Sequence, residues 1–279
     1  MWRYEELRAG GVSRGAVRHR VEAGRLGRLS RGVYGRADDE TGRLRALFRR
    51  LPPDAVAGFH TGARLHRFGA VPADVVHVIV PAGGPVPSIR GVAVHQSVLP
   101  VRDVVEVAGV PCAPAARCAV DLARVLRRSD ALPVLDLCLR VGACRRADLL
   151  AEVTGHAGLR GVRQAGRLAE LADPRSECRQ ESQLRLLLID AGLPAPEPQL
   201  WVPDDDGVPV YRLDLGYRQQ RIGVEYDGRS HLDPDRLHHD RSRMNWLAEQ
   251  GWRIRVYTAT DLYRRPNHIP KSVRALLCQ

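Results

Sequence analysis

The chain has 279 residues, of which 44% are hydrophobic, and this size and composition suit two or three small domains with ordinary cores. Its 43 Lys and Arg residues outnumber its 32 Asp and Glu residues, so the formal net charge is +11 and an acidic partner such as DNA is expected. No apolar run is long enough to cross a bilayer, and no apolar signal core stands at the N-terminus. We therefore expect a cytoplasmic protein with no membrane partner.

The first 36 residues hold more than half of the net charge, with nine arginines against three acids. Ser13 is a good N-cap for a helix that runs to about Ala23, Gly24 ends this helix, and residues 26–34 form a short ribbon interrupted by arginines. These are the parts of a winged helix-turn-helix, whose second helix enters the major groove of DNA while the wing touches the backbone. The expected DNA contacts are Arg14, Arg18, Arg20, Arg25, Arg28 and Arg31.

The segment SRGAVRHRVEAGRLGRLSRGVYG, which begins at Ser13, resembles the N-terminal domain of the AbiEi antitoxins of type IV toxin–antitoxin systems. This resemblance implies a DNA-binding protein with a cognate toxin as a partner. The arginine excess has a second explanation, a GC-rich genome, because the chain contains one lysine, Lys271. The net charge is the same under both explanations, so an acidic partner is expected in either case.

The middle of the chain reads as an α/β domain. Strands are expected at Val75–Val80 and Val92–Val94, and helices at Ala116–Leu126 and Leu132–Leu139. The histidines of this part have no metal-ligand spacing, and the six cysteines of the chain form no CxxC pair. We interpret them as structural side chains and reduced thiols rather than as disulfides or zinc ligands.

Acidic residues gather on a predicted hairpin in the C-terminal part. Two short strands, Tyr211–Gly216 and Ile222–Asp227, flank a polar turn whose centre places Asp214 directly opposite Glu225. Cross-strand partners share a face of the sheet, as do residues two apart on one strand, so Asp214, Glu225 and Asp227 cluster. Three carboxylates repel one another unless a cation sits among them, which predicts a hard-metal site for phosphodiester hydrolysis. The alternative is a polar face whose carboxylates are solvated.

A further acid comes from the helical segment Ser176–Ala191. Leu184 and Leu188 lie on one stripe of this helix, and the stripe extended backwards reaches Glu181. A helix packed on the sheet therefore aims Glu181 at the acids of the hairpin. The alternative is a charged first turn that the helix dipole favours.

After the hairpin the chain reads as a helix followed by a strand. Asp233 is a candidate N-cap, Pro234 takes the first helical position, and Gly251 ends the helix. Apolar and polar residues then alternate over Trp252–Tyr257, as in a strand. Hairpin, helix and strand in this order imply a crossover connection and a mixed sheet.

The stretch from about Ser176 to Leu277 resembles the restriction-endonuclease-like fold, in the branch of the very-short-patch-repair (Vsr-like) mismatch endonucleases. The resemblance implies Mg²⁺ or Mn²⁺ bound by Asp214 as the principal ligand and Glu225 as a second one. It also implies Glu181 as the acid on the helix and His231 near the scissile phosphate. The residues that carry the resemblance are Glu181-Ser182-x-Leu184-Arg185, Asp214, Glu225-Tyr226-Asp227-Gly228, His231, Asp240-Arg241 and Gly251-Trp252.

The chain departs from the wider nuclease superfamily at one position. That superfamily usually has a lysine two residues after the acid of the second strand, and here the position is Asp227. The Vsr-like branch shares this departure. His231, or a water held by the metal and Asp227, would then handle the proton, and the ordinary histidine pKa of about 6.5 suits that role.

We expect an α/β multidomain protein with a winged helix-turn-helix at residues 1–53 and an α/β middle, antitoxin-like domain at residues 54–171. A restriction-endonuclease-like mixed sheet flanked by helices is expected at residues 172–279, after a hinge within Gly158–Arg175. The predicted function is a metal-dependent DNA endonuclease in repair or in defence against phage and mobile elements. The alternative is a non-enzymatic, antitoxin-like transcriptional regulator with an inactive nuclease fold.

Overall fold

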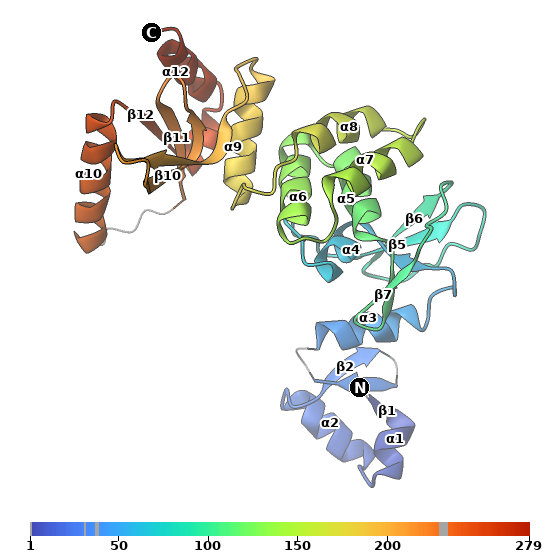
Figure 1. Ribbon diagram of the computed structural model, residues 1–279. Helices are drawn as coiled ribbons and strands as arrows, with labels where there is room; N and C mark the ends of the chain where they lie inside the picture. The colour runs from blue at the N-terminus through green and yellow to red at the C-terminus, as the bar shows by residue number, and fades with distance from the viewer. Residues whose placement is uncertain (1, 31, 37–38, 229–233) are drawn as a thin grey trace. The chain divides into compact units, whose positions relative to one another are not determined.

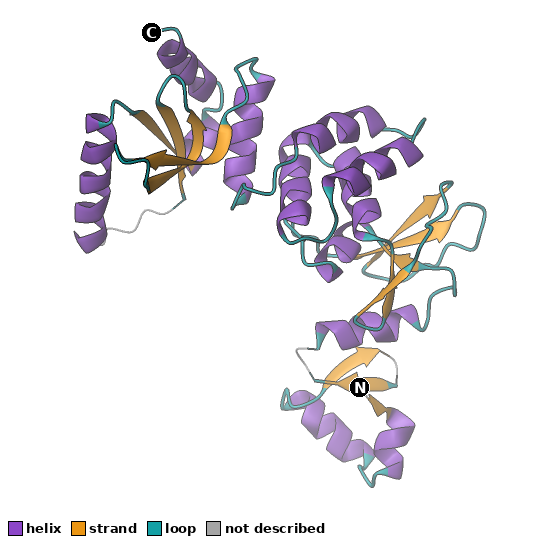
Figure 2. Ribbon diagram, in the orientation of Figure 1, coloured by secondary structure: helices purple, strands orange, loops and turns teal. Residues whose placement is uncertain are grey.

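The computed structural model describes residues 2–30, 32–36, 39–228 and 234–279. The chain forms two compact units, Met1–Cys118 and Ala119–Gln279, whose elements Figure 1 colours in chain order. Helices and strands occur in both units (Figure 2), which confirms the predicted α/β multidomain class. Within the described residues no helix is both long and apolar enough to cross a membrane. The boundaries predicted at residues 53 and 171 stay predictions, since the division into units falls at residue 118.

The N-terminal part of unit 1 has two helices and a small antiparallel sheet with the strand order β1-β3-β2. Ser13 caps α2 as predicted, because its Oγ accepts a hydrogen bond from the Ala16 N–H at 3.2 Å. Val17 and Leu26 are buried beneath the helix and the ribbon. This order of helices and ribbon is the predicted winged helix-turn-helix. Its elements are β1 (Trp2–Arg3), α1 (Tyr4–Ala9), α2 (Arg14–Glu22), β2 (Gly27–Ser30) and β3 (Val33–Gly35).

The rest of unit 1 contains a five-stranded mixed sheet. Its strand order is β6-β5-β4-β8-β7, in which β5 pairs parallel with β6 and β4 pairs parallel with β8. The two strands predicted in this part of the sequence are confirmed as β5 and β6. The elements are α3 (Glu40–Phe48), β4 (Val56–Ala57), α4 (Phe59–Leu65), β5 (Val76–Pro81), β6 (Val92–Ser97), β7 (Val105–Val107) and β8 (Val110–Cys112).

Unit 2 begins with helices, of which α5 crosses the boundary between the units. The helices predicted at residues 116–126 and 132–139 are confirmed as α5 and α6. The hinge predicted within residues 158–175 is wrong for most of its length, because α8 occupies it and packs against α6 and α7. Ala165 and Leu168 of α8 are fully buried, so small side chains serve close packing there rather than flexibility. The helices are α5 (Ala115–Val125), α6 (Arg128–Arg140), α7 (Arg146–Gly155) and α8 (Val162–Leu171).

The C-terminal part of unit 2 is a four-stranded mixed sheet with helices on both faces (Figure 1). The strand order is β12-β11-β10-β9, and only the β11–β12 pair is parallel, which confirms the predicted crossover. Gly251 has a φ of 75° after α10 and ends that helix as predicted. The elements are α9 (Arg179–Asp190), β9 (Glu197–Pro203), β10 (Pro209–Tyr217), β11 (Ile222–Asp227), α10 (Pro234–Glu249), β12 (Arg253–Thr258), α11 (Ala259–Arg264) and α12 (His268–Leu277).

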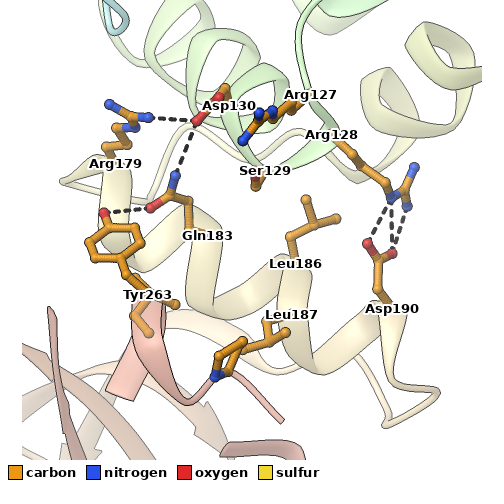
Figure 3. A pocket seen from close by; sticks show the side chains of 12 residues that line it. Arg127, Arg128, Ser129, Asp130, Arg179, Gln183, Leu186, Leu187, Asp190 and Tyr263 are labelled. Atoms are coloured by element: carbon orange, nitrogen blue, oxygen red, sulfur yellow. Dashed lines mark hydrogen bonds and ion pairs between the residues drawn. The ribbon is translucent and has the colours of Figure 1, made fainter. Parts of the chain in front are cut away.

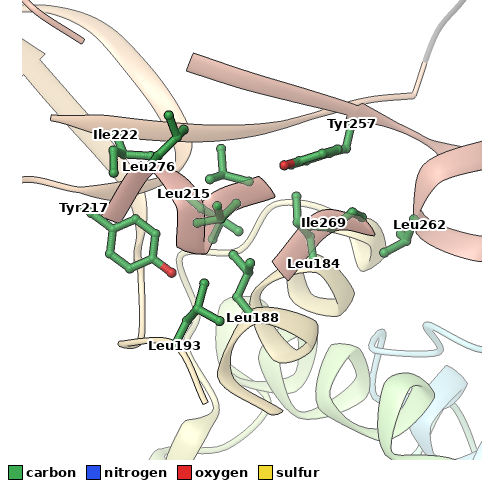
Figure 4. Close-up of a cluster of buried hydrophobic side chains, with 12 residues drawn as sticks. Leu184, Leu188, Leu193, Leu215, Tyr217, Ile222, Tyr257, Leu262, Ile269 and Leu276 are labelled. Carbon is green, nitrogen blue, oxygen red and sulfur yellow. The ribbon is translucent and has the colours of Figure 1, made fainter. Parts of the chain in front are cut away.

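Two apolar clusters hold the helices against this sheet. In Figure 4, Leu184 and Leu188 of α9 meet Leu215 of β10 and Ile269 of α12. The second cluster joins Leu247 of α10 to Trp252, which precedes β12, and to the sheet residues Leu200, Val202 and Leu213. Burying each of these leucines stabilises the fold by roughly 1.5–3 kcal/mol.

The edge strand β12 departs from the predicted alternation. Trp252 and Ile254 join the second cluster as expected, but Val256 is 46% exposed whereas Tyr257 is 4% exposed. Because helices cover both faces of the sheet, a side chain can be buried on either face. The simple alternation of apolar and polar residues therefore gives the wrong burial at the end of this strand.

A buried ion pair ties α9 to α6. The Arg185 guanidinium donates to both carboxylate oxygens of Asp136, at 2.9 and 3.1 Å, and to the Leu171 carbonyl at 2.7 Å. Asp136 also accepts a hydrogen bond from the Asp173 N–H at 2.7 Å. The side chains of Arg185 and Asp136 are 5% and 1% exposed, so α9 shares a buried polar contact with the helical part of the unit.

Candidate functional site

The acidic hairpin has the predicted register. Leu215 lies opposite Val224, and the same register extended by one position places Asp214 opposite Glu225. The Tyr226 N–H donates to Asp214 Oδ2 at 2.9 Å, which fixes the Asp214 carboxyl against β11. The hairpin therefore brings these two acids to neighbouring positions on two strands.

Among the acids of the hairpin, Asp214 has a carboxyl group whose pKa is clearly raised. Its pKa is raised from 3.8 to about 6, chiefly by burial and in smaller part by the negative charges of Glu181 and Glu225. The hydrogen bond from the Tyr226 N–H and the charge of Arg243 act in the opposite direction. The raised pKa shows that Asp214, Glu181 and Glu225 share one electrostatic environment.

Glu225 is paired with Arg243 of α10. The Arg243 Nη1 donates to Glu225 Oε2 at 2.9 Å and its Nη2 donates to Oε1, so the pair is bidentate. The Arg243 Nη2 also donates to the Arg212 carbonyl at 3.1 Å, and the guanidinium carbon lies 5.9 Å from the centroid of the Tyr211 ring. Sequence reasoning missed this partner of Glu225. One sequence feature could have indicated it: Arg243 lies one turn before Leu247, on the apolar stripe of the helix.

Glu181 lies in the first turn of α9 and is 6% exposed. Its Oε2 accepts hydrogen bonds from the Glu177 N–H at 2.8 Å and from the Gln199 amide at 2.7 Å. Gln199 has a φ of 52°, a left-handed conformation that is uncommon outside glycine, within β9. Both interpretations of Glu181 therefore have structural support: it stabilises the first turn of its own helix, and it lies near Asp214.

Of the two remaining acid–base residues of the prediction, only Asp227 falls within the described part of the chain, where it ends β11. Asp227 is exposed and pairs with Thr258 of β12 in the parallel ladder. His231 lies outside the described residues. The assignment of both as catalytic residues stays a prediction.

The donor set of these acids suits Mg²⁺ or Mn²⁺, because carboxylate oxygens are the ligands that hard cations prefer. The pKa of Asp214 is raised mainly by burial and in smaller part by the charges of Glu181 and Glu225, and a bound cation would offset those charges. Among the described residues, however, the carboxylates of Asp214, Glu225 and Glu181 are not gathered with all their ligand atoms within 4.8 Å of one another. Arg243 supplies the positive charge at Glu225, so a metal held by all three acids requires Arg243 to release Glu225.

The second candidate surface is the basic side of the winged helix-turn-helix. Arg14 and Arg18 lie one turn apart on α2, and together with Arg28 of the ribbon they line a hollow of about 570 Å³. Tyr4 and Tyr34 line the same hollow. All three arginines are exposed. Arg14, Arg18 and Arg28 therefore converge on this hollow from the helix and from the wing.

The other predicted DNA contacts lie elsewhere on this surface. Arg20 and Arg25 are exposed but do not line the hollow. Helical spacing places Arg20 about 240° around the helix axis from Arg14, at 100° per residue. Arg31 lies outside the described residues.

A cavity of about 570 Å³ between α6, α9 and α11 is lined by five charged side chains, of which four pair with one another (Figure 3). Arg128 donates to both oxygens of Asp190, at distances of 2.8 to 3.0 Å, and Arg179 pairs with Asp130 at 2.5 Å. The Tyr263 hydroxyl donates to the Gln183 side-chain carbonyl at 2.9 Å. These pairs join the helices to one another, and none of the predicted site residues lines the cavity.

Comparison with known proteins gives matches over most of the chain. The family model of the AbiEi antitoxin C-terminal domain matches residues 33–172. The uncharacterized proteins MT2308 and Rv2248 of Mycobacterium tuberculosis are each 34% identical to the chain over 251 residues, which is 89% of this chain and 91% of the relative. An alignment of that length extends beyond the matched family segment into the C-terminal sheet. These findings support the resemblance to the AbiEi antitoxins, and the resemblance to Vsr-like endonucleases stays a prediction.

Proposed function

Because the chain belongs to the AbiEi antitoxin family, we propose that it is a DNA-binding regulator that acts through its N-terminal winged helix-turn-helix. The observation that carries the proposal is the convergence of Arg14, Arg18 and Arg28 on one hollow of the surface. In this arrangement α2 enters the major groove and the ribbon of β2 and β3 touches the adjacent backbone.

The charges and dimensions of α2 agree with this docking. An α-helix with its side chains is about 10–12 Å wide, and the major groove is about 12 Å wide. Arg14 and Arg18 point to the same side of the helix because they are four residues apart. Guanidinium groups form bidentate hydrogen bonds with phosphate oxygens or with the edge of guanine, so these residues can position the helix and read bases.

The family name also suggests a second partner. Antitoxins act with cognate toxins, and the matched segment covers residues 33–172. We propose that a toxin contact, where one exists, uses this segment, which leaves the basic side of α2 available for DNA.

A reporter gene placed behind the DNA that precedes the gene for this chain tests the proposal. Expression of the wild-type chain should lower reporter output, and the double substitution Arg14→Gln with Arg18→Gln should restore it. The matched control Arg49→Gln with Arg50→Gln removes the same charge from exposed positions after α3 and should still repress. Equal repression by all three proteins would contradict a role for α2.

A second candidate function is hydrolysis of DNA phosphodiesters at the acidic hairpin. It is favoured by the raised pKa of Asp214, which burial causes in the main and the charges of Glu181 and Glu225 increase. We propose that these three acids hold the ion and orient water, and that Asp227 or His231 handles the proton. When bound, Mg²⁺ or Mn²⁺ polarises the phosphoryl oxygen and lowers the pKa of water.

A nicking assay tests the second function separately. Wild-type protein is incubated with supercoiled, mismatched and single-stranded DNA in the presence of Mg²⁺ or Mn²⁺. A nuclease nicks one of these substrates, Asp214→Asn abolishes nicking while DNA binding holds, and the exposed control Asp205→Asn keeps activity. Absence of cleavage on every substrate would leave the regulator as the only function.

A further inference from the structure

Three soft metal-binding side chains meet inside unit 1, although they come from different elements. His66 directly follows α4, Cys112 ends β8, and Cys118 lies in the first turns of α5. One ligand atom of each residue lies within 4.8 Å of the ligand atoms of the other two. Among the described residues this is the one group of three or more His, Cys, Asp or Glu side chains that meets this distance.

The spacing of these atoms agrees with tetrahedral coordination. Cys112 Sγ lies 3.5 Å from His66 Nε2. A tetrahedral zinc ion with a Zn–S distance of about 2.3 Å and a Zn–N distance of about 2.05 Å places its sulfur and nitrogen ligands about 3.6 Å apart. The two atoms therefore stand at ligand separation before any ion is added.

The surroundings favour a neutral metal complex. Cys112 and Cys118 are both fully buried. Two thiolates, a neutral imidazole and a divalent cation have no net charge, so the complex avoids leaving an isolated charge in the interior.

The backbone near the cluster is shaped to admit the Cys118 thiol. A Cβ atom at Gly62 of α4 would lie 2.3 Å from Cys118 Sγ, so only glycine at this position leaves room for the sulfur. The Ala113 carbonyl lies 2.8 Å from His66 Nε2 and accepts a hydrogen bond from Cys118 Sγ at 3.5 Å. This carbonyl holds both side chains toward the same point.

We propose that His66, Cys112 and Cys118 form a binding site for a soft divalent cation, with Zn²⁺ as the principal ion. Sulfur and imidazole ligands select Zn²⁺ over Mg²⁺, which prefers oxygen. Binding of the ion releases the protons of the two thiols, and the neutral imidazole carries its one proton on Nδ1, so that Nε2 gives up its contact with the Ala113 carbonyl and coordinates the ion. Bound in this way, it ties α4, β8 and α5 together. The site uses no residue of the acidic hairpin or of the basic hollow.

Cobalt substitution of the full chain tests the site. Metal-free protein titrated with Co²⁺ should develop thiolate-to-cobalt charge-transfer bands and tetrahedral d–d bands, and Zn²⁺ should displace the cobalt at one ion per chain. Cys112→Ser, Cys118→Ser and His66→Gln should each weaken or remove these bands. The control Cys138→Ser should leave them unchanged, although Cys138 Sγ lies only 3.4 Å from Cys144 Sγ.

A second readout covers the chance that a cysteine variant folds poorly. Zn²⁺ should raise the Tm of wild type and of Cys138→Ser, and this increase should be lost in His66→Gln, whose side chain is only partly buried. The proposal is overturned if wild-type protein shows no cobalt bands, or if Cys138→Ser removes them as fully as the cluster variants do. It is also overturned if His66→Gln keeps both the bands and the increase in Tm.

Discussion

At the scale of single residues, the acids of the C-terminal sheet are held by partners from distant segments. The positions of Asp214 and Glu225 could be predicted from the sequence. The alternation of side chains along a strand has a period of two residues, so it depends only on neighbouring residues in the chain. Arg243, the partner of Glu225, comes from α10, and Gln199, the partner of Glu181, comes from β9, and no local pattern specifies such contacts. Arg243 could have been recognised only as a charged residue on an apolar stripe. The roles of these acids as metal ligands stay predictions, because the side-chain rotamers decide whether their oxygens can reach one ion, and no local sequence pattern specifies the rotamers.

Replacing Asp214 by Asn should change how stability depends on pH. The folded-state pKa of Asp214 is raised from 3.8 to about 6, so the folded protein binds this proton more tightly than the unfolded chain. Stability therefore falls as pH rises from about 4 to about 6, and the ionised carboxylate destabilises the fold at pH 7. Asp214→Asn should flatten this fall and stabilise the protein at pH 7 by about 3 kcal/mol at most. Urea unfolding at several pH values measures the free energy of unfolding of both proteins. Parallel plots of this free energy against pH for wild type and Asp214→Asn would count against a raised pKa of Asp214.

Replacing Arg243 by Gln should leave the Glu225 carboxylate nearly buried without its cation. Breaking one partner of a buried pair costs about 3 kcal/mol, whereas removing both charges costs much less. The double substitution Arg243→Gln with Glu225→Gln should therefore be more stable than Arg243→Gln alone in denaturant unfolding. A single variant as stable as the double one would mean that the pair contributes nothing.

At the scale of elements, local periodicity predicted where strands and helices occur. It predicted less well which of their side chains are buried and what packs against them. The register of the hairpin, the crossover to β12, the N-cap of α2 and the end of α10 at Gly251 follow from short patterns of turn residues and apolar spacing. Asp233, the predicted N-cap of α10, lies outside the described residues. The exposure of Val256 and the helix in place of the expected hinge depend on what packs against each segment. The histidine and cysteine cluster escaped sequence reasoning because its members are 46 and 6 residues apart along the chain.

The contact between α6 and α9 provides a matched pair of stability tests. Arg185→Gln removes the partner of the fully buried Asp136 and should destabilise unit 2 by about 3–5 kcal/mol. Arg128→Gln breaks a second pair between the same helices, whose side chains are 31% and 39% exposed, and should cost about 1 kcal/mol or less. Thermal unfolding of both variants checks this. Equal decreases in Tm for both variants would show that burial does not make one ion pair matter more to stability than the other.

At the scale of the whole molecule, two chemically distinct surfaces belong to two different units. The basic hollow lies in Met1–Cys118, and the acidic hairpin lies in Ala119–Gln279. The family match begins within the ribbon of the first surface and ends before the second. DNA binding and any hydrolysis are therefore separable by substitution, and each can be measured while the other is left intact.

The salt dependence of DNA affinity tests the proposed role of the basic hollow most directly. The slope of log K against log salt reports the number of phosphates that the protein neutralises, at about 0.9 per contact on duplex DNA. Wild-type protein should bind duplex DNA with a steep slope. Arg14→Gln with Arg18→Gln should bind more weakly, with a slope smaller by about one to two. The control Arg49→Gln with Arg50→Gln should keep the wild-type slope. An unchanged slope in the α2 variant would contradict the proposal that this helix docks on DNA.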